Sequence, residues 1–175
     1  AWAVAEIAEW DLATLFTTEA PPVRVTELLP VKEIIRTPGG RIVLDFGQNF
    51  SGWVRFTIDA PAGTTVVLHH TEVLIHGEPD FEPNRTALTT DTFISAGDGS
   101  ITWEPRFTYH GFRYVDVEGW PGELDPAAFT GVVIHTDMVR TGWFECSHPM
   151  INKFHDNVVW STRGNFVSLP TDCPQ

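Results

Sequence analysis

The stretch Gly52-Trp-Val-Arg-Phe-Thr-Ile58 decides the fold class of this chain. Aliphatic and phenyl side chains stand at every second position, and the positions between them hold indole, guanidinium and hydroxyl groups. This period-two alternation is typical of a β-strand that buries one face and exposes the other. The stretch therefore predicts a half-buried strand.

Short runs of the same kind flank this strand on both sides, separated by turn residues such as Pro38–Gly39–Gly40. About ten strands are expected, drawn from the following runs: Val23–Leu29, Val31–Ile35, Arg41–Phe46, Gly52–Ile58, Thr64–Val73, Asp91–Ser95, Ile101–Glu104, Phe107–His110, Phe112–Glu118, Gly131–Thr136 and Gly142–Cys146. No helical pattern lies between them, which argues against a βαβ fold. The sequence thus predicts an all-β fold, an antiparallel β-sandwich.

Two connections can be predicted within this region. The turn Gly97–Asp98–Gly99 joins Asp91–Ser95 to Ile101–Glu104, which indicates a hairpin. Ile75–Thr90 is rich in polar and turn residues and shows little periodicity, so we expect a long loop there.

One C-terminal α-helix is expected after the strands. Ser147 can cap it, Pro149 suits its first turn and Gly164 can close it. Apolar residues between them recur on one face: Met150, Ile151, Phe154, Val158 and Val159. We expect the apolar surface around Phe154 and Trp160 to be exposed.

The order of these segments divides the chain into three parts. Residues 1–22 form a lead-in segment, residues 23–146 the β-sandwich domain, and residues 147–175 the first helix of a second, helical domain. There is no initiator methionine, and the sequence stops soon after the helix. We therefore expect a piece of a longer protein.

Composition excludes several classes of protein. Of the 175 residues, 42% are hydrophobic and 19% charged, which allows a sizeable core and excludes a disordered chain. The formal net charge of −12 disfavours nucleic acid as a partner, and the apolar runs are too short for a membrane span. Cys146 and Cys173 cannot form a disulfide framework, which slightly favours the cytoplasm.

Histidine chemistry offers weak candidates. No Gly-x-Ser-x-Gly turn accompanies the seven histidines. His69 and His70 are adjacent, so on a strand they point to opposite faces and cannot bind one ion together. A site that joins one of them to His110 or His135 would need long-range folding, so neither a metal nor a cofactor is expected.

Sugar chemistry is a second possibility that the residues alone leave open. Glycoside hydrolysis needs two carboxyl groups across one bond, and no spacing among the many carboxylates singles out a pair. Tryptophan suits sugar stacking, but Trp53, Trp103 and Trp143 lie in strand patterns and are predicted to be core residues.

Three stretches together resemble one family. They are Pro38-Gly-Gly-Arg-Ile-Val-Leu-Asp-Phe-Gly-Gln-Asn49, Trp103-Glu-Pro-Arg-Phe-Thr-Tyr-His-Gly-Phe-Arg-Tyr-Val115 and Arg163-Gly-Asn-Phe-Val-Ser-Leu-Pro-Thr-Asp-Cys-Pro-Gln175. In this order they are similar to the bacterial α-L-rhamnosidases of glycoside hydrolase family 78. The resemblance runs from about Pro22 to the C-terminus.

The resemblance implies a fold and an activity. In the family, a concanavalin-like (jelly-roll-like) β-sandwich precedes an (α/α)6 barrel that removes terminal α-L-rhamnose with inversion. The resemblance places Asp172 in the rhamnose subsite, and it places the general acid and the general base beyond residue 175. The chain alone is then expected to have no catalytic residue and no hydrolytic activity. It would be a scaffold for the barrel, and rhamnose-containing glycosides would be partners of the intact enzyme.

A lectin-like module that binds rhamnosides itself is the alternative. The expected loop Ile75–Thr90 carries Glu78, Asp80, Glu82 and Asn84, whose oxygens are of the kind that calcium prefers. Their spacing matches no known ion-binding loop.

Without the barrel, Asp172 is expected to lie near a free end and to bind nothing.

Overall fold

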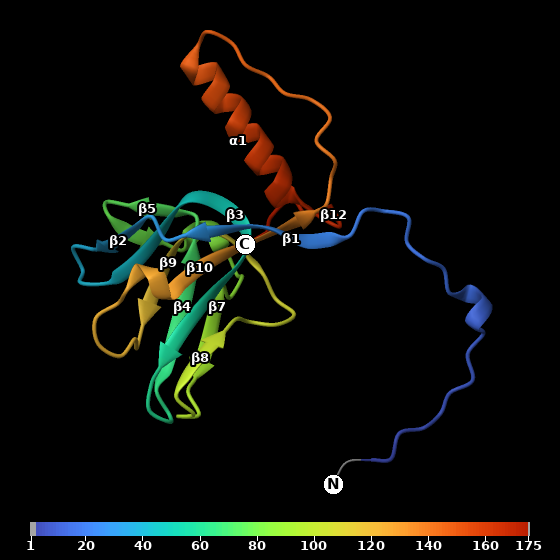
Figure 1. The fold of residues 1–175 in the computed structure, drawn as a ribbon, viewed down its shortest axis with the longest axis horizontal. Coiled ribbons are helices and arrows are strands. Elements are labelled where there is room, and N and C mark those ends of the chain that lie inside the picture. Colours follow the sequence, from blue (N-terminus) through green and yellow to red (C-terminus); the bar gives the residue numbers. More distant parts are fainter. Residues whose placement is uncertain (1–2, 175) are drawn as a thin grey trace.

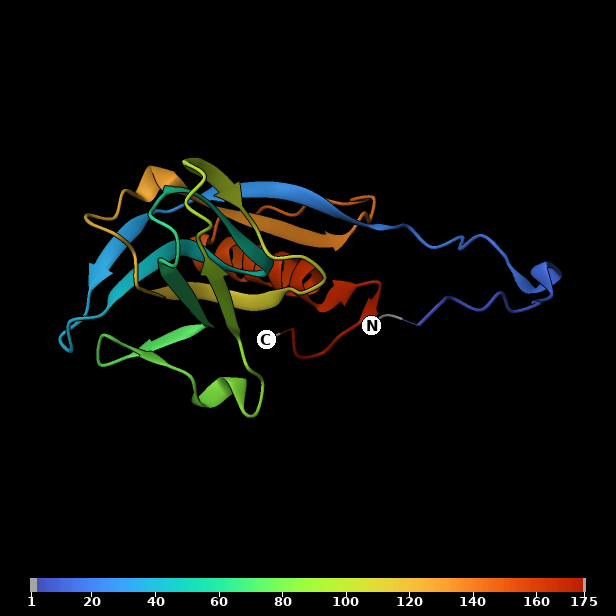
Figure 2. The same ribbon diagram turned by 90° about the horizontal axis from the view of Figure 1, so that it is seen from below.

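The computed structural model describes residues 3–174 and consists mainly of antiparallel strands, with one α-helix near the C-terminus (Figure 1). Residues 3–22 are exposed and contain a single 3-10 turn, Leu12–Thr14. This segment extends away from the strands in both views (Figures 1 and 2). Residues 1, 2 and 175 lie outside the described part. No helix within the described range is long and apolar enough to cross a membrane.

The main sheet contains eight strands: β1 (Val23–Pro30), β2 (Glu33–Arg36), β3 (Ile42–Asp59), β4 (Thr65–Thr71), β7 (Thr90–Ile94), β8 (Ser100–Trp103), β9 (His110–Glu118) and β10 (Phe129–Thr136). Their order is β1-β10-β3-β9-β4-β7, and β2 and β8 also pair with β3. Two small pairs complete the set: β5 (Val73–Ile75) with β6 (Glu78–Asp80), and β11 (Phe166–Val167) with β12 (Leu169–Pro170). Every pairing is antiparallel, as predicted.

The strand β3 joins the two layers of the sandwich. Its first half pairs with β2 and β9, and its second half with β10 and β8. The sequence predicted two strands here, but the backbone continues through a register shift between Asp45 and Phe50. Gly52 stands at the transfer point, since it pairs with His110 of β9 and with Val133 of β10.

Aromatic rings fill the space between the layers. Phe46, Phe50 and Phe112 form one group, in which Phe46 meets the other two rings edge-on. A second group surrounds Phe56: Phe93, Trp103, Trp120 and Phe129. The alternation of residues 52–58 is confirmed, because Val54, Phe56 and Ile58 are buried and the residues between them are not.

Several local predictions were wrong. No hairpin joins β7 to β8, because β7 pairs with β4 and β8 with β3. Ser95 continues along the β4 side through hydrogen bonds with Gly63 and Thr64, so the turn after it carries the chain to a different neighbour. Residues 142–146 form no strand, and Trp143 is 76% exposed rather than core. The run expected from residue 107 to 110 is irregular up to His110, where β9 begins.

The expected loop Ile75–Thr90 contains regular structure. The strands β5 and β6 form a hairpin across His76 and Gly77, which both have positive φ. Two such central residues are typical of the type I′ turn that closes a two-residue hairpin. A 3-10 turn, Glu82–Asn84, follows.

The helix α1 (Pro149–Asn165) confirms the predicted C-terminal helix. His148 precedes it rather than Ser147, and it continues through Gly164. Its expected apolar face is open to solvent, with Phe154 67% exposed, whereas Trp160 packs against the sandwich core. In Figure 1 the helix projects from the strands.

Substitution of Gly52 by alanine should destabilise the fold. A Cβ atom at this position would lie 1.9 Å from the carbonyl oxygen of Val132, a backbone atom that cannot move aside alone. We expect Gly52→Ala to lower the free energy of unfolding by at least about 2 kcal/mol, measured by chemical denaturation. Gly142→Ala is the control, because nothing lies within 4 Å of its Cβ position. Equal stability of the two variants would contradict this close approach of β3 and β10.

Candidate functional site

A hollow of about 480 Å³ lies where the C-terminal end of α1 meets the sandwich. It contains the predicted site residue Asp172. Its lining comes from both parts of the chain: Gln48, Asn49, Phe50, Ser51, Glu72 and Gly111 from the sandwich, and Asn157, Trp160, Ser161, Thr162, Gly164, Asn165, Asp172 and Pro174 from the C-terminal segment.

Hydrogen bonds fasten the C-terminal segment to the sandwich. Ser51 Oγ of β3 donates to the carbonyl oxygen of Gly164 at 2.8 Å. The backbone N–H of Ser168 donates to Thr136 Oγ1 of β10 at 3.0 Å. Trp160 adds an apolar contact with the core. These contacts set the position of the last turn of α1 relative to β3 and β10.

Asp172 is held at the hollow by the residue that ends α1. Its backbone N–H donates to Asn165 Oδ1 at 2.5 Å, and Thr171 donates to the Asn165 carbonyl through both its N–H and its hydroxyl. Asp172 has a positive φ of 64°, a conformation that Asp and Asn adopt more readily than most residues. The Asp172 side chain is exposed, so its carboxylate is open to a ligand.

The other polar groups of the hollow belong to the sandwich. Glu72 Oε1 accepts a hydrogen bond from Asn49 Nδ2 at 2.7 Å, and Gln48 Nε2 donates to the Asn49 carbonyl at 2.8 Å. Carboxylates and amides beside an indole ring suit a hydroxyl-rich ligand, which presents both hydroxyls and C–H faces. Gln48, Asn49 and Glu72 were not predicted as site residues. Gln48 and Asn49 close the first family stretch, which was a usable signal, whereas nothing marked Glu72.

Asp45 and Arg113 fix the part of β3 that carries Gln48 and Asn49. Arg113 donates to both oxygens of Asp45, at 2.8 and 2.7 Å, and the N–H of Gly47 donates to Oδ1 at 2.6 Å. Burial alone would raise the pKa of Asp45. The hydrogen bonds from Arg113 and Gly47, with the charges of Arg113 and Lys32, outweigh that effect and hold the pKa below its usual value.

The loop carboxylates of the lectin-like alternative turn to separate partners. Glu78 accepts the N–H of Gly39 at 2.5 Å, and Asp80 accepts that of Glu82 at 3.1 Å. Asn84 is buried and donates to the carbonyl of His70 and to Thr89 Oγ1. Glu78, Asp80 and Asn84 thus each have partners of their own within the chain.

The histidines are arranged differently from the expectation. His70 and His110, which lie far apart in the sequence, stack with their ring centroids 4.3 Å apart. His69 faces away toward Thr90, and His135 contacts the carbonyl of Thr136. Sequence spacing gave no sign of the stacked pair, because it depends on the tertiary fold: His70 pairs with Val115 of β9, and His110, at the start of β9, pairs with Gly52 of β3.

Comparison with known proteins identifies the family. Residues 35–135 match the family described as the bacterial alpha-L-rhamnosidase concanavalin-like domain. The chain belongs to this family. Residues 139–175 match a second description, the bacterial alpha-L-rhamnosidase six-hairpin glycosidase domain. The resemblance to bacterial α-L-rhamnosidases and the concanavalin-like sandwich are thereby confirmed.

Individual α-L-rhamnosidases are similar over nearly the whole chain. One from Streptomyces avermitilis is 44% identical over 176 residues, which cover 99% of this chain and 17% of the relative. Among solved structures, native α-L-rhamnosidase from Aspergillus terreus has 51% identity and a TM-score of 0.86, over 89% of this chain and 18% of that one. The Streptomyces avermitilis enzyme complexed with L-rhamnose has 47% identity and a TM-score of 0.84, over 89% and 15%. The concanavalin-like chain thus spans less than a fifth of the length of these relatives.

Removal of the Asp45 charge should weaken the concanavalin-like domain at neutral pH. The folded-state pKa of Asp45 is lowered, so its stabilising contribution is present above the unfolded pKa and is lost as pH falls through the folded value. Arg113 is about a third exposed, so we expect Asp45→Asn to lower the free energy of unfolding by roughly 2–4 kcal/mol at pH 7. The difference from wild type should shrink below about pH 4.

Denaturation followed from pH 7 to pH 2.5 measures this effect. Asp59→Asn, at the exposed end of the same strand, is the control. A stability difference for Asp45→Asn that stays constant over that range would contradict the role of the charge.

Proposed function

We propose that this chain serves as the concanavalin-like domain and first helix of an α-L-rhamnosidase, a glycoside hydrolase that removes terminal α-L-rhamnose with inversion. Two named families match consecutive parts of the chain, and its relatives are α-L-rhamnosidases several times longer. The division at residues 22 and 146 is part of the proposal. The first matched range, 35–135, lies within the proposed sandwich, whereas the second, 139–175, begins before the proposed boundary at residue 146.

One observation carries the proposed role of the sandwich. The bonds from Ser51 to Gly164 and from Ser168 to Thr136 hold the segment that bears Asp172 against β3 and β10. We infer that the sandwich positions Asp172, whose carboxylate accepts hydrogen bonds from rhamnose hydroxyls. The general acid and general base of the inverting reaction would be supplied by later parts of the barrel. The chain alone would then be inactive.

The open face of α1 fits the proposed second partner. Met150, Phe154 and Val158 are exposed on the helix, and the six-hairpin domain of the relatives offers further helices to cover them. Burial of these side chains would contribute apolar area to the junction between sandwich and barrel. In this arrangement the sandwich and the barrel share α1.

A chimeric enzyme tests the proposal. The matching segment of the Streptomyces avermitilis relative is replaced by residues 1–175, and hydrolysis of p-nitrophenyl α-L-rhamnopyranoside is measured. We expect an active chimera in which Asp172→Asn raises KM by roughly tenfold to a hundredfold, because a hydrogen bond to a charged group is worth about 1.5–3 kcal/mol. The exposed Asp98→Asn is the matched control. An unchanged KM for Asp172→Asn would contradict the site, and an inactive, folded chimera would contradict the scaffold.

Calorimetric titration of the 175-residue chain with L-rhamnose, with and without calcium, distinguishes the scaffold proposal from the lectin-like alternative. The scaffold proposal expects no heat up to millimolar sugar. Saturable binding that is lost in Asp80→Ala with Glu82→Ala would instead support a recognition module.

A further inference from the structure

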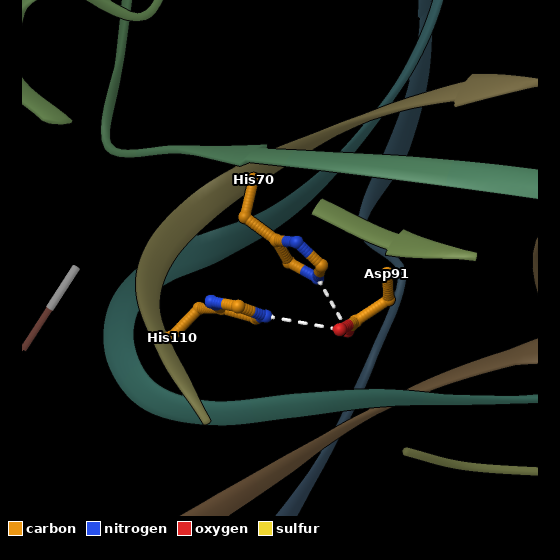
Figure 3. A group of neighbouring side chains, drawn as sticks. All are labelled: His70, Asp91 and His110. Carbon is orange, nitrogen blue, oxygen red and sulfur yellow. Dashed lines mark hydrogen bonds and ion pairs between the residues drawn. The ribbon is translucent and has the colours of Figure 1, made fainter. Parts of the chain in front are cut away.

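Three polar side chains that do not line the Asp172 hollow meet inside the sandwich. They are His70 of β4, Asp91 of β7 and His110 of β9 (Figure 3). These neighbouring strands place all three on the inner face, where the residues are 0%, 7% and 5% exposed. Buried charged and polar groups require partners, so the partners of each atom are informative.

The hydrogen bonds of the group are incomplete. His110 Nε2 contacts Asp91 Oδ1 at 3.1 Å. His70 Nε2 points at Asp91 Oδ2, but 3.8 Å separates them, and both atoms are buried without a hydrogen-bond partner. Among the described residues, four buried side-chain atoms lack a hydrogen-bond partner. Another of the four, Asn84 Oδ1, belongs to a residue whose Nδ2 donates to the His70 carbonyl.

The tautomer of His70 follows from its other nitrogen. Nδ1 lies 3.0 Å from the carbonyl oxygen of Thr89, which can only accept, so Nδ1 carries the proton. In the neutral ring this tautomer leaves Nε2 unprotonated. Nε2 therefore presents a lone pair to a carboxylate oxygen. Two buried acceptors that face each other call for a cation between them.

We propose that His70 Nε2, Asp91 Oδ2 and His110 Nε2 bind a divalent transition-metal ion, of which zinc fits best. The ligand atoms lie within 4.8 Å of one another. Bonds of about 2.1 Å place two zinc ligands roughly 3.4 Å apart at a tetrahedral angle, so the side chains would close by up to about 1.4 Å on binding. Imidazole and carboxylate are ligands that zinc accepts, and the fourth position would hold water.

The surroundings suit such a site. The bond from His70 Nδ1 to Thr89 orients the ring, as outer-shell carbonyls do for metal-bound histidines. Asn84 donates to the carbonyl of His70 and to Thr89 Oγ1, which fixes that bond in turn. His110 would bind after its Nε2 proton moves to Nδ1, so the ring stays neutral and no oxidant or reductant is needed. The ion would tie β4, β7 and β9 together, a structural role distinct from hydrolysis.

Metal titration of the 175-residue chain tests the proposal. After chelator treatment and dialysis, the protein is titrated with ZnCl2 by calorimetry and with CoCl2 by visible absorption. We expect one ion per chain, a cobalt spectrum without thiolate charge transfer from Cys146 or Cys173, and a higher unfolding temperature with zinc. His70→Gln and Asp91→Asn should weaken zinc binding by more than about 100-fold, because even outer-shell partners are worth about 10–100-fold.

His69→Gln is the matched control, since it changes the neighbouring residue on β4 whose ring bonds Thr90. It should leave zinc affinity unchanged. Near-ultraviolet circular dichroism checks that each variant is folded. Absence of zinc binding by the wild-type chain would overturn the proposal even if the variants fail to fold. So would binding that persists in folded His70→Gln and Asp91→Asn.

Discussion

The bend of β3 is the constraint on which both layers of the sandwich depend. A strand that belongs to both layers stops pairing with one neighbouring strand and begins pairing with another within a few residues. The backbone groups at this change of partner therefore need other hydrogen-bond partners. Asp45 accepts one of them, the N–H of Gly47, and Arg113 of β9 neutralises its charge. Gly52 then lets β9 and β10 approach β3 from either side. The inner faces can close on a common aromatic core only because both conditions hold.

The same crossing organises the candidate site. Gln48, Asn49 and Ser51 lie between the Asp45 anchor and Gly52, and they line the hollow that contains Asp172. Ser51 also bonds the end of α1, so the segment that interrupts the ladder is the one that holds the helix. This explains why the first stretch of the resemblance, from residue 38 to 49, carries so few groups with obvious chemistry. Its residues mainly fix the positions of other residues around the hollow.

Local pattern predicted the faces of the strands but not their neighbours. The alternation of residues 52–58 was confirmed because one strand buries one face whatever it pairs with. The hairpin at Gly97–Gly99 was wrong because pairing is decided by which ladder Ser95 extends, a contact with residues about thirty positions earlier. Trp143 was wrongly predicted as core because the run from 142 to 146, which follows β10, joins no strand ladder. The hollow combined one predicted residue, Asp172, with groups that only the fold brings beside it.

The buried cluster of His70, Asp91 and His110 could be predicted from the sequence only in part. His70, Asp91 and His110 each stand two positions from a buried apolar residue of the same strand, so the period of two already places them on inner faces. A polar residue in phase with core positions must find a partner inside the protein, which makes such residues worth marking in a sequence. That rule identifies the three residues but does not predict that they lie together. Assembly follows from the order β9-β4-β7, which brings both histidine rings, stacked on each other, to the carboxylate of Asp91.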